Sequence, residues 1–207
     1  MLSSTSFAAA VVACCVAIFF AVNISNVVWG IRRRRGIGSR AELSPPSDRE
    51  GLMLAGISTF LFFIFSGLFV TLALFGLRNL SPIGLLQIPQ PETVRWSGII
   101  FFAAGSALFV WSVLARGRYS VSWSMPVNHR LVTWGPYKYV RHPSYTGYFL
   151  MFIGLFLIWF NLLAATPLLG ILGYVQIAHK EEEMLALRFG SAYADYQKNT
   201  GKFLPKL

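Results

Sequence analysis

The sequence predicts an all-α integral membrane protein of about five transmembrane helices, the last two forming a helical hairpin, with a cytoplasmic helical tail. Of its 207 residues, 55% are apolar and only 13% are charged, and the mean hydropathy is +0.57. Charged residues make up about a quarter of an ordinary soluble domain. The apolar residues gather in four long stretches, and most basic residues lie in the segments between them or after the last one.

Three of the four apolar stretches have the length of one crossing each. Residues 7–30, 52–77 and 94–115 contain at most one charged residue apiece, and about 20 apolar residues span the core of a bilayer. The first stretch lacks a basic region before it and is long for a cleaved signal peptide, so we expect it to remain as a membrane helix. Residues 1–115 are therefore predicted to form three membrane helices, with a basic cytoplasmic linker at 31–51.

The fourth stretch is too long for one crossing. Residues 145–178 contain no charge, and Asn161 and Pro167 interrupt them near the middle. We predict a hairpin over 144–178 with two arms of about 17 residues, the short end of the spanning range. Pro143 suits the first position of its first helix, since proline is favoured there.

After the hairpin the chain becomes polar and amphipathic. We expect a helix over about 179–189, a break at Gly190, and a further helix to about Lys198 with Ser191 as its cap. Catalysis by polar side chains needs segments outside the bilayer, and such segments flank the hairpin on both sides. We therefore predict a catalytic portion over residues 116–207, made of the cytoplasmic loop, the hairpin and the tail (residues 179–207).

The basic residues predict the orientation in the membrane. Sixteen of the 18 Lys and Arg residues lie in 31–51, 116–143 and 180–207, which share one side if there are five helices. Cytoplasmic loops carry an excess of Lys and Arg, so these segments are predicted to be cytoplasmic. The membrane topology then explains the net charge of +10, and we expect the partner to be a membrane and not a nucleic acid. Nothing in the sequence specifies an oligomeric state.

Several common chemistries have no motif here. The sequence contains no glycine-rich phosphate loop and no dinucleotide-binding, zinc-protease or serine-hydrolase pattern. His129, His142 and His179 lack metal-binding spacing, so no metal is predicted. The adjacent Cys14 and Cys15 fall inside the first helix and are expected to pack there.

Arg141 and His142 stand directly before the predicted start of the hairpin. The helix dipole already places partial positive charge there, so a further cation is unfavourable unless an anion such as a carboxylate is bound. Simple anchoring at the lipid headgroups is the alternative interpretation. The first turns of this helix also carry two hydroxyl-bearing rings on one face and a glycine that leaves room for close approach: Tyr145, Tyr148 and Gly147.

A second polar cluster, Glu181-Glu182-Glu183, follows the hairpin. It holds three of the eight acidic residues, beside a membrane surface that is expected to be anionic. A solvated acidic face paired with nearby basic residues is the alternative interpretation. Because a hairpin returns the chain to the side it left, residues 141–148 and 179–183 are predicted to lie side by side and to share a site.

Together, L-V-T-W-G-P-Y-K-Y-V-R-H-P-S-Y-T-G-Y (131–148) and E-E-E-M-L-A-L-R-F-G-S-A-Y-A-D-Y-Q-K-N-T-G-K-F-L-P (181–205) resemble the isoprenylcysteine carboxyl methyltransferase and phospholipid N-methyltransferase family. Its members are integral membrane enzymes that use S-adenosylmethionine. The resemblance implies that Arg141, His142 and Glu182 are catalytic. It also implies a cofactor pocket, to which we add Tyr148 as the second ring of its face: Tyr137, Arg141, His142, Pro143, Tyr145, Gly147, Tyr148, Glu181 and Glu182.

The implied function is methyl transfer from S-adenosylmethionine to a lipid or lipophilic acceptor at the cytoplasmic face. A prenylcysteine carboxylate, a phospholipid amine, and a small thiol or alcohol all remain open as acceptors. A related group, the NADPH-dependent sterol-type reductases, commonly has Asn after R-H-P and lacks the glutamate pair, whereas this chain has Ser144 and keeps the pair. That reductase activity is the first alternative, and a non-enzymatic protein that binds anionic lipid is the second.

Overall fold

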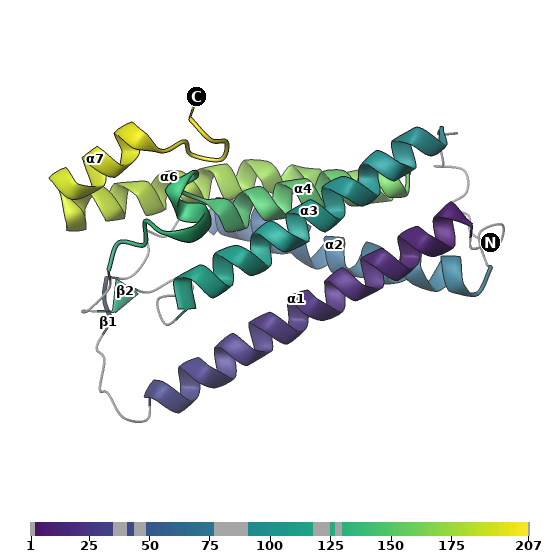
Figure 1. Ribbon diagram of the computed structural model, residues 1–207, viewed down its shortest axis with the longest axis horizontal. Coiled ribbons are helices and arrows are strands. Elements are labelled where there is room, and N and C mark those ends of the chain that lie inside the picture. The colour runs from purple at the N-terminus through teal and green to yellow at the C-terminus, as the bar shows by residue number, and fades with distance from the viewer. Residues whose placement is uncertain are drawn as a thin grey trace.

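Long antiparallel helices dominate the computed structural model (Figure 1), which describes residues 3–34, 41–43, 49–76, 91–117, 125–126 and 130–206. Within these residues, four segments are long and apolar enough to cross a membrane: Ser4–Val28, Arg49–Leu74, Glu92–Arg116 and Leu162–Phe189. They lie in α1 (Ser4–Arg34), α2 (Arg49–Leu74), α3 (Glu92–Arg116) and the second arm of the hairpin. With the shorter α4 (Pro143–Ile158), they confirm the predicted all-α membrane fold.

The hairpin turns where its two interruptions were predicted. After α4, the side chain of Asn161 accepts a hydrogen bond from the backbone N–H of Leu163 at 2.8 Å and begins the short α5 (Leu162–Ala165). Pro167 lies in the 3₁₀ turn η5 (Thr166–Leu169), and α6 (Gly170–Phe189) returns the chain. The two arms therefore run in opposite directions, as Figure 1 shows.

The second arm is longer than predicted. The sequence suggested a new helix from about residue 179, but α6 continues unbroken to Phe189, because no Gly or Pro interrupts it after Gly173. The predicted break at Gly190 is confirmed: its φ of 52° reverses the chain before α7 (Ser191–Asn199). The prediction that Ser191 caps α7 is wrong, since Gly190 occupies the cap position and no side chain caps the helix.

A small β-pair was not predicted. β1 (Ala41–Leu43) lies antiparallel to β2 (Met125–Pro126) and so joins the linker after α1 to the loop after α3. Residues 35–40 and 44–48 of the predicted linker, and His129, lie outside the described residues.

Each arm of the hairpin packs on an earlier helix: α4 on α3, and α6 on α2, while α1 covers α2 and α3. Large side chains such as Phe62, Phe102 and Phe152 are fully buried between them. Other apolar side chains, including Phe60 and Ile100, point outward and are exposed, as expected for surfaces that face lipid. The C-terminal end of α3, the start of α4 and the end of α6 meet at one end of the molecule, together with α7 (Figure 1).

Candidate active site

The start of α4 is held by a segment from the C-terminus. The 3₁₀ turn η4 (Gly135–Lys138) leads to His142, which occupies the cap position, and to Pro143, the buried first residue of α4. We call Thr200–Phe203 the C-terminal segment. It lies parallel to residues 139–142: the backbone N–H of Arg141 donates to the carbonyl of Gly201 at 2.9 Å, and that of His142 to the carbonyl of Lys202 at 3.1 Å.

This pairing bears on the anion that the sequence led us to expect at the start of α4. The backbone N–H groups of Arg141 and His142 both donate to carbonyl groups of the C-terminal segment and so cannot hold it. The hydroxyl of Thr146, one turn into α4, also donates to the carbonyl of Phe203 at 2.9 Å. The C-terminal segment therefore closes the end of α4 on this side.

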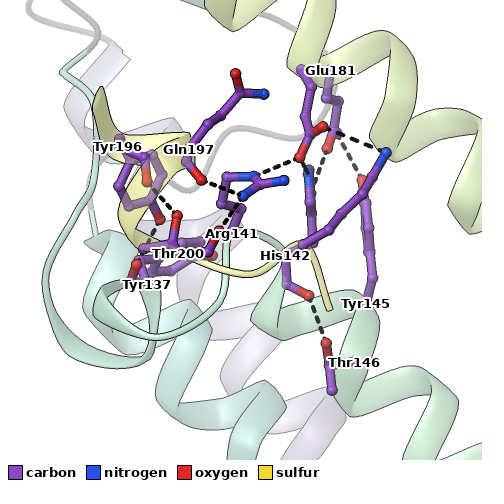
Figure 2. Close-up of polar contacts among 11 residues, drawn as sticks. Tyr137, Arg141, His142, Tyr145, Thr146, Glu181, Tyr196, Gln197 and Thr200 are labelled. Carbon is purple, nitrogen blue, oxygen red and sulfur yellow. Dashed lines mark hydrogen bonds and ion pairs between the residues drawn. The ribbon is translucent and has the colours of Figure 1, made fainter. Parts of the chain in front are cut away.

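Arg141 joins three elements (Figure 2). Its Nε donates to Oε1 of Glu182 on α6 at 2.7 Å, and its Nη1 donates to the carbonyl of Gln197 at 3.4 Å and to that of Thr200. The side chains of Arg141 and Glu182 are each only 12% exposed. A buried guanidinium with a carboxylate and two carbonyl groups around it is well satisfied.

His142 lies between the two carboxylates of α6. Its Nε2 is 3.2 Å from Oε1 of Glu182, and its Nδ1 is 3.4 Å from Oε2 of Glu181. Burial alone would lower the pKa of His142, but hydrogen bonds and charge from Glu181 and Glu182 outweigh it and raise that pKa above its usual value. The arrangement therefore favours the protonated imidazolium.

The two glutamates have further partners. The hydroxyl of Tyr145 donates to Oε1 of Glu181 at 2.7 Å, and the ring of Tyr145 stacks on that of His142, with centroids 5.5 Å apart. Nζ of Lys202 is 3.5 Å from Oε2 of Glu182. Glu183 turns the other way and pairs with Lys180 and His179 on the exposed side of α6. Thus Glu181 and Glu182 face the site, while Glu183 belongs to the surface.

Three predicted residues remain: Tyr137, Tyr148 and Gly147. Tyr137 is buried, and its carbonyl accepts a hydrogen bond from the hydroxyl of Tyr196 at 2.6 Å. Tyr148 stacks on Tyr174 of α6, with centroids 5.1 Å apart, so it faces the other arm. Gly147 faces α3, where a Cβ would lie 2.8 Å from the carbonyl oxygen of Gly105. Packing therefore explains Gly147, and its predicted contact with a cofactor stays a prediction.

Sequence reasoning missed two aromatic residues near the site. Tyr174 stacks near both Tyr145 and Tyr148, and its hydroxyl is 2.8 Å from Oγ1 of Thr59 on α2. It stands seven residues before Glu181, hence on the same helix face, and that spacing could have identified it. Tyr196 belongs to the F-G-x-x-Y-x-x-Y tail of the motif but was given no role.

These observations define a class of protein: an integral membrane protein with a polar, aromatic-lined site at one end of a helical hairpin. Within the described residues, no group of three His, Cys, Asp or Glu side chains could hold a metal. Residues 93–192, from α3 to the start of α7, match the phospholipid methyltransferase family model.

Relatives with curated names agree with this match. The chain is 32% identical over 125 residues to the protein-S-isoprenylcysteine O-methyltransferase of Tribolium castaneum (56% of this chain, 44% of that protein). It is 30% identical over 133 residues to that of Mus musculus (61% and 41%), and 35% identical over 80 residues to that of Schizosaccharomyces pombe (38% and 34%). The chain thus spans less than half the length of these relatives.

The solved structure of the eukaryotic intramembrane Ras methyltransferase ICMT is also similar, with 27% identity and a TM-score of 0.46 over 77% of this chain and 53% of that chain. The family-model match and the curated relatives confirm the resemblance, seen in the two motifs, to the isoprenylcysteine carboxyl methyltransferase and phospholipid methyltransferase family.

Proposed function

We propose that this protein is an S-adenosylmethionine-dependent methyltransferase that esterifies the carboxylate of a lipophilic acceptor, such as an isoprenylated cysteine, at the cytoplasmic face of a membrane. The observation that carries the proposal is the meeting of Arg141 and His142 with Glu181 and Glu182 across the hairpin. These residues belong to the two motifs on which the resemblance to the family rests. Curated relatives of the chain are named protein-S-isoprenylcysteine O-methyltransferases.

The chemistry of the side chains fits the cofactor. Glu181 and Glu182 are anionic partners for an ammonium group and for ribose hydroxyls, and the faces of Tyr145 and Tyr148 can stabilise a sulfonium cation. When bound, S-adenosylmethionine supplies an electrophilic methyl group. The protein's own task is then to bind, orient and exclude water, and Arg141 contributes by fixing the position of Glu182.

The state of the site favours a carboxylate acceptor over an amine. A carboxylate can accept a methyl group without losing a proton, whereas a protonated amine needs a base. Both ring nitrogens of His142 already face the carboxylates of Glu181 and Glu182, so neither is free to take up a proton from an acceptor. Glu181 and Glu182 are already engaged by Tyr145 and Arg141. An NADPH-dependent reductase is less compatible, because this chain keeps the glutamate pair that the related reductases commonly lack.

The cytoplasmic placement rests on charge. The site lies at the end of the molecule where α3 ends and α4 begins (Figure 1). Sixteen of the 18 Lys and Arg residues belong to the segments 31–51, 116–143 and 180–207, at the ends of α1 and α3 and after the predicted hairpin, and such basic segments stay in the cytoplasm. An acceptor held in the bilayer by its lipid would meet the site near the headgroups.

Purified full-length protein in nanodiscs tests the proposal. We expect binding of S-adenosylmethionine but not NADPH, and transfer of a labelled methyl group to an S-farnesylated cysteine derivative but not to its carboxamide. Glu182→Gln should weaken cofactor binding about 100-fold, because it leaves Arg141 and His142 without their charged partner. Calorimetry measures the affinity, and mass spectrometry identifies the product.

Glu183→Gln is the matched control, because it makes the same change at the next position, on the exposed side of α6. Its cofactor affinity should stay within about twofold of the wild type. The proposal fails if NADPH binds in place of S-adenosylmethionine, if the carboxamide is methylated equally well, or if the two variants behave alike.

A further inference from the structure

Several buried polar atoms have no hydrogen-bond partner among the described residues, and they include Nε of Arg116 and the hydroxyl of Tyr137. Arg116 is the last residue of α3, and Tyr137 lies in η4 with only 7% of its surface exposed. Buried polar groups in proteins are nearly always hydrogen-bonded, and an unpaired one calls for an explanation. Both atoms are donors, so a bound acceptor would satisfy them together.

The two residues are brought together by the packing of η4 on the end of α3. Nε1 of Trp134 donates to the carbonyl of Ala115 at 2.9 Å, and a Cβ on Gly135 would lie 2.9 Å from the Cβ of Ala115. Burial raises the pKa of Tyr137, and the positive charge of Arg116 partly opposes that rise. Arg116 and Tyr137 therefore belong to elements that pack on each other, and the charge of Arg116 acts on the Tyr137 hydroxyl.

Nearby hydroxyl groups do not account for the orphaned donors. Ser112 and Ser144 are the hydroxyl-bearing neighbours of Tyr137, but neither makes a hydrogen bond of normal geometry with it. The hydroxyl of Ser112 instead donates to the carbonyl of Phe109 at 2.7 Å. The surroundings of the Tyr137 hydroxyl are therefore polar and buried, yet they leave it without a hydrogen-bond partner among the described residues.

Arg116 differs from Arg141 in its charge balance. Arg141 is held by Glu182 and by two carbonyl groups. Arg116 has no ion pair with any carboxylate in the described part of the chain. A partly buried cation without a counter-charge is costly, so an anion is expected beside Arg116 rather than beside Arg141.

We propose that Arg116 and Tyr137 form an anion-binding subsite that holds the carboxylate of a ligand. The charge of Arg116 also reaches Tyr145, whose hydroxyl donates to Glu181. A zwitterionic amino-acid group would then place its carboxylate at Arg116 and its ammonium near Glu181. The inference rests on the proposed function, in which both the cofactor and the acceptor carry a carboxylate.

Binding of two cofactor forms to the full-length protein in nanodiscs tests the subsite. Decarboxylated S-adenosylmethionine keeps the ammonium, the sulfonium and the nucleoside but lacks the carboxylate. If the subsite holds the cofactor's carboxylate, Arg116→Gln should weaken binding of S-adenosylmethionine about 10- to 100-fold and leave the decarboxylated form within about threefold. Arg116→Lys should recover part of the loss, and Tyr137→Phe should lose about three- to tenfold.

If the carboxylate belongs to the acceptor, Arg116→Gln should leave S-adenosylmethionine binding unchanged. It should instead raise KM for the S-farnesylated cysteine derivative about 10- to 100-fold, with most of kcat retained. Arg95→Gln removes the same charge from the opposite end of α3, where Arg95 pairs with Glu92, and serves as the matched control. It should change neither quantity by more than about twofold.

Three results would separate or overturn these ideas. Unchanged affinities and unchanged KM in Arg116→Gln overturn the subsite and leave the proposed function standing. An equal loss of both cofactor forms, together with a lower unfolding temperature, means that Arg116 supports the fold, and this also overturns the subsite. If the wild type binds neither cofactor form, the proposed function itself fails.

Discussion

Helix α4 has two very different faces. Toward α3 it packs backbone against backbone: a Cβ on Gly105 would lie 2.6 Å from the carbonyl oxygen of Gly147, and one on Gly154 would lie 2.6 Å from the backbone nitrogen of Phe102. Toward α6 it carries rings, and Tyr145 and Tyr148 lie 4.9 and 5.1 Å from the ring of Tyr174. The face toward α3 fixes the position of α4, whereas on the other face the rings keep the backbones of α4 and α6 further apart.

The difference shows how a polar site can be kept inside an apolar fold. Close contact through small residues holds membrane helices together by van der Waals packing, so α3 can fix α4 without help from the site. The face toward α6 can then carry the hydroxyl-bearing ring of Tyr145, which meets the carboxylate of Glu181 on α6. We expect changes on the first face to affect stability and changes on the second to affect function.

The largest effect should come from the close contact of α3 with α4. Gly154→Leu has no room for its side chain beside Phe102 and should lower the free energy of unfolding by about 3 kcal/mol, the upper end for overpacking. Thermal unfolding in detergent micelles measures the change.

Gly67→Leu is the matched control, since Gly67 lies in α2 with nothing within 4 Å of an added Cβ. It should be neutral or stabilising by about 1 kcal/mol through helix propensity. Equal destabilisation by both substitutions would show that the close contact is not what holds α4.

A smaller effect is expected on the aromatic face. Tyr174→Phe keeps the ring but removes the hydrogen bond with Thr59, so it should lower the free energy of unfolding by about 1 kcal/mol. Thr59→Val should cost a similar amount, and the double variant should cost little more than either single one. Tyr139→Phe, at a ring that is 53% exposed, is the control and should have no effect. Additive losses in the double variant would contradict the bond.

The smallest effect concerns pH. The pKa of His142 is raised in the folded protein by Glu181 and Glu182, against the lowering by burial, and Arg141, Tyr145 and Lys202 are the other titratable groups around it. Its contribution to stability is therefore complete below the unfolded pKa of about 6.5 and is lost as the pH rises through the folded pKa.

Unfolding temperatures of the wild type and of His142→Gln, compared from about pH 5.5 to pH 9, measure this contribution. The advantage of the wild type should shrink as the pH rises. A difference between the two proteins that stays constant, or grows with pH, would mean that His142 is neutral in the fold.

Much of the site could be predicted because its key parts are adjacent in the sequence. Arg141 and His142 are neighbours before Pro143, Glu181 and Glu182 are neighbours after the hairpin, and a hairpin must return the chain to the side it left. The C-terminal segment could not be predicted in this way. Its pairing with residues 139–142 joins positions about 60 residues apart through backbone groups, which leave no pattern in the side chains.

Sequence alone determined the class of fold, the place of the hairpin and the charged residues at the open end of the hairpin. These features follow from hydropathy, proline and charge, which act locally along the chain. Tertiary structure decided which charges meet. It joined Arg141 to Glu182 and the C-terminal segment and turned Glu183 outward. It also left Nε of Arg116 and the hydroxyl of Tyr137 buried without a hydrogen-bond partner in the described part of the chain. Those outcomes depend on how far apart α3, α4 and α6 lie, and that spacing is set by glycines and rings distributed over three helices.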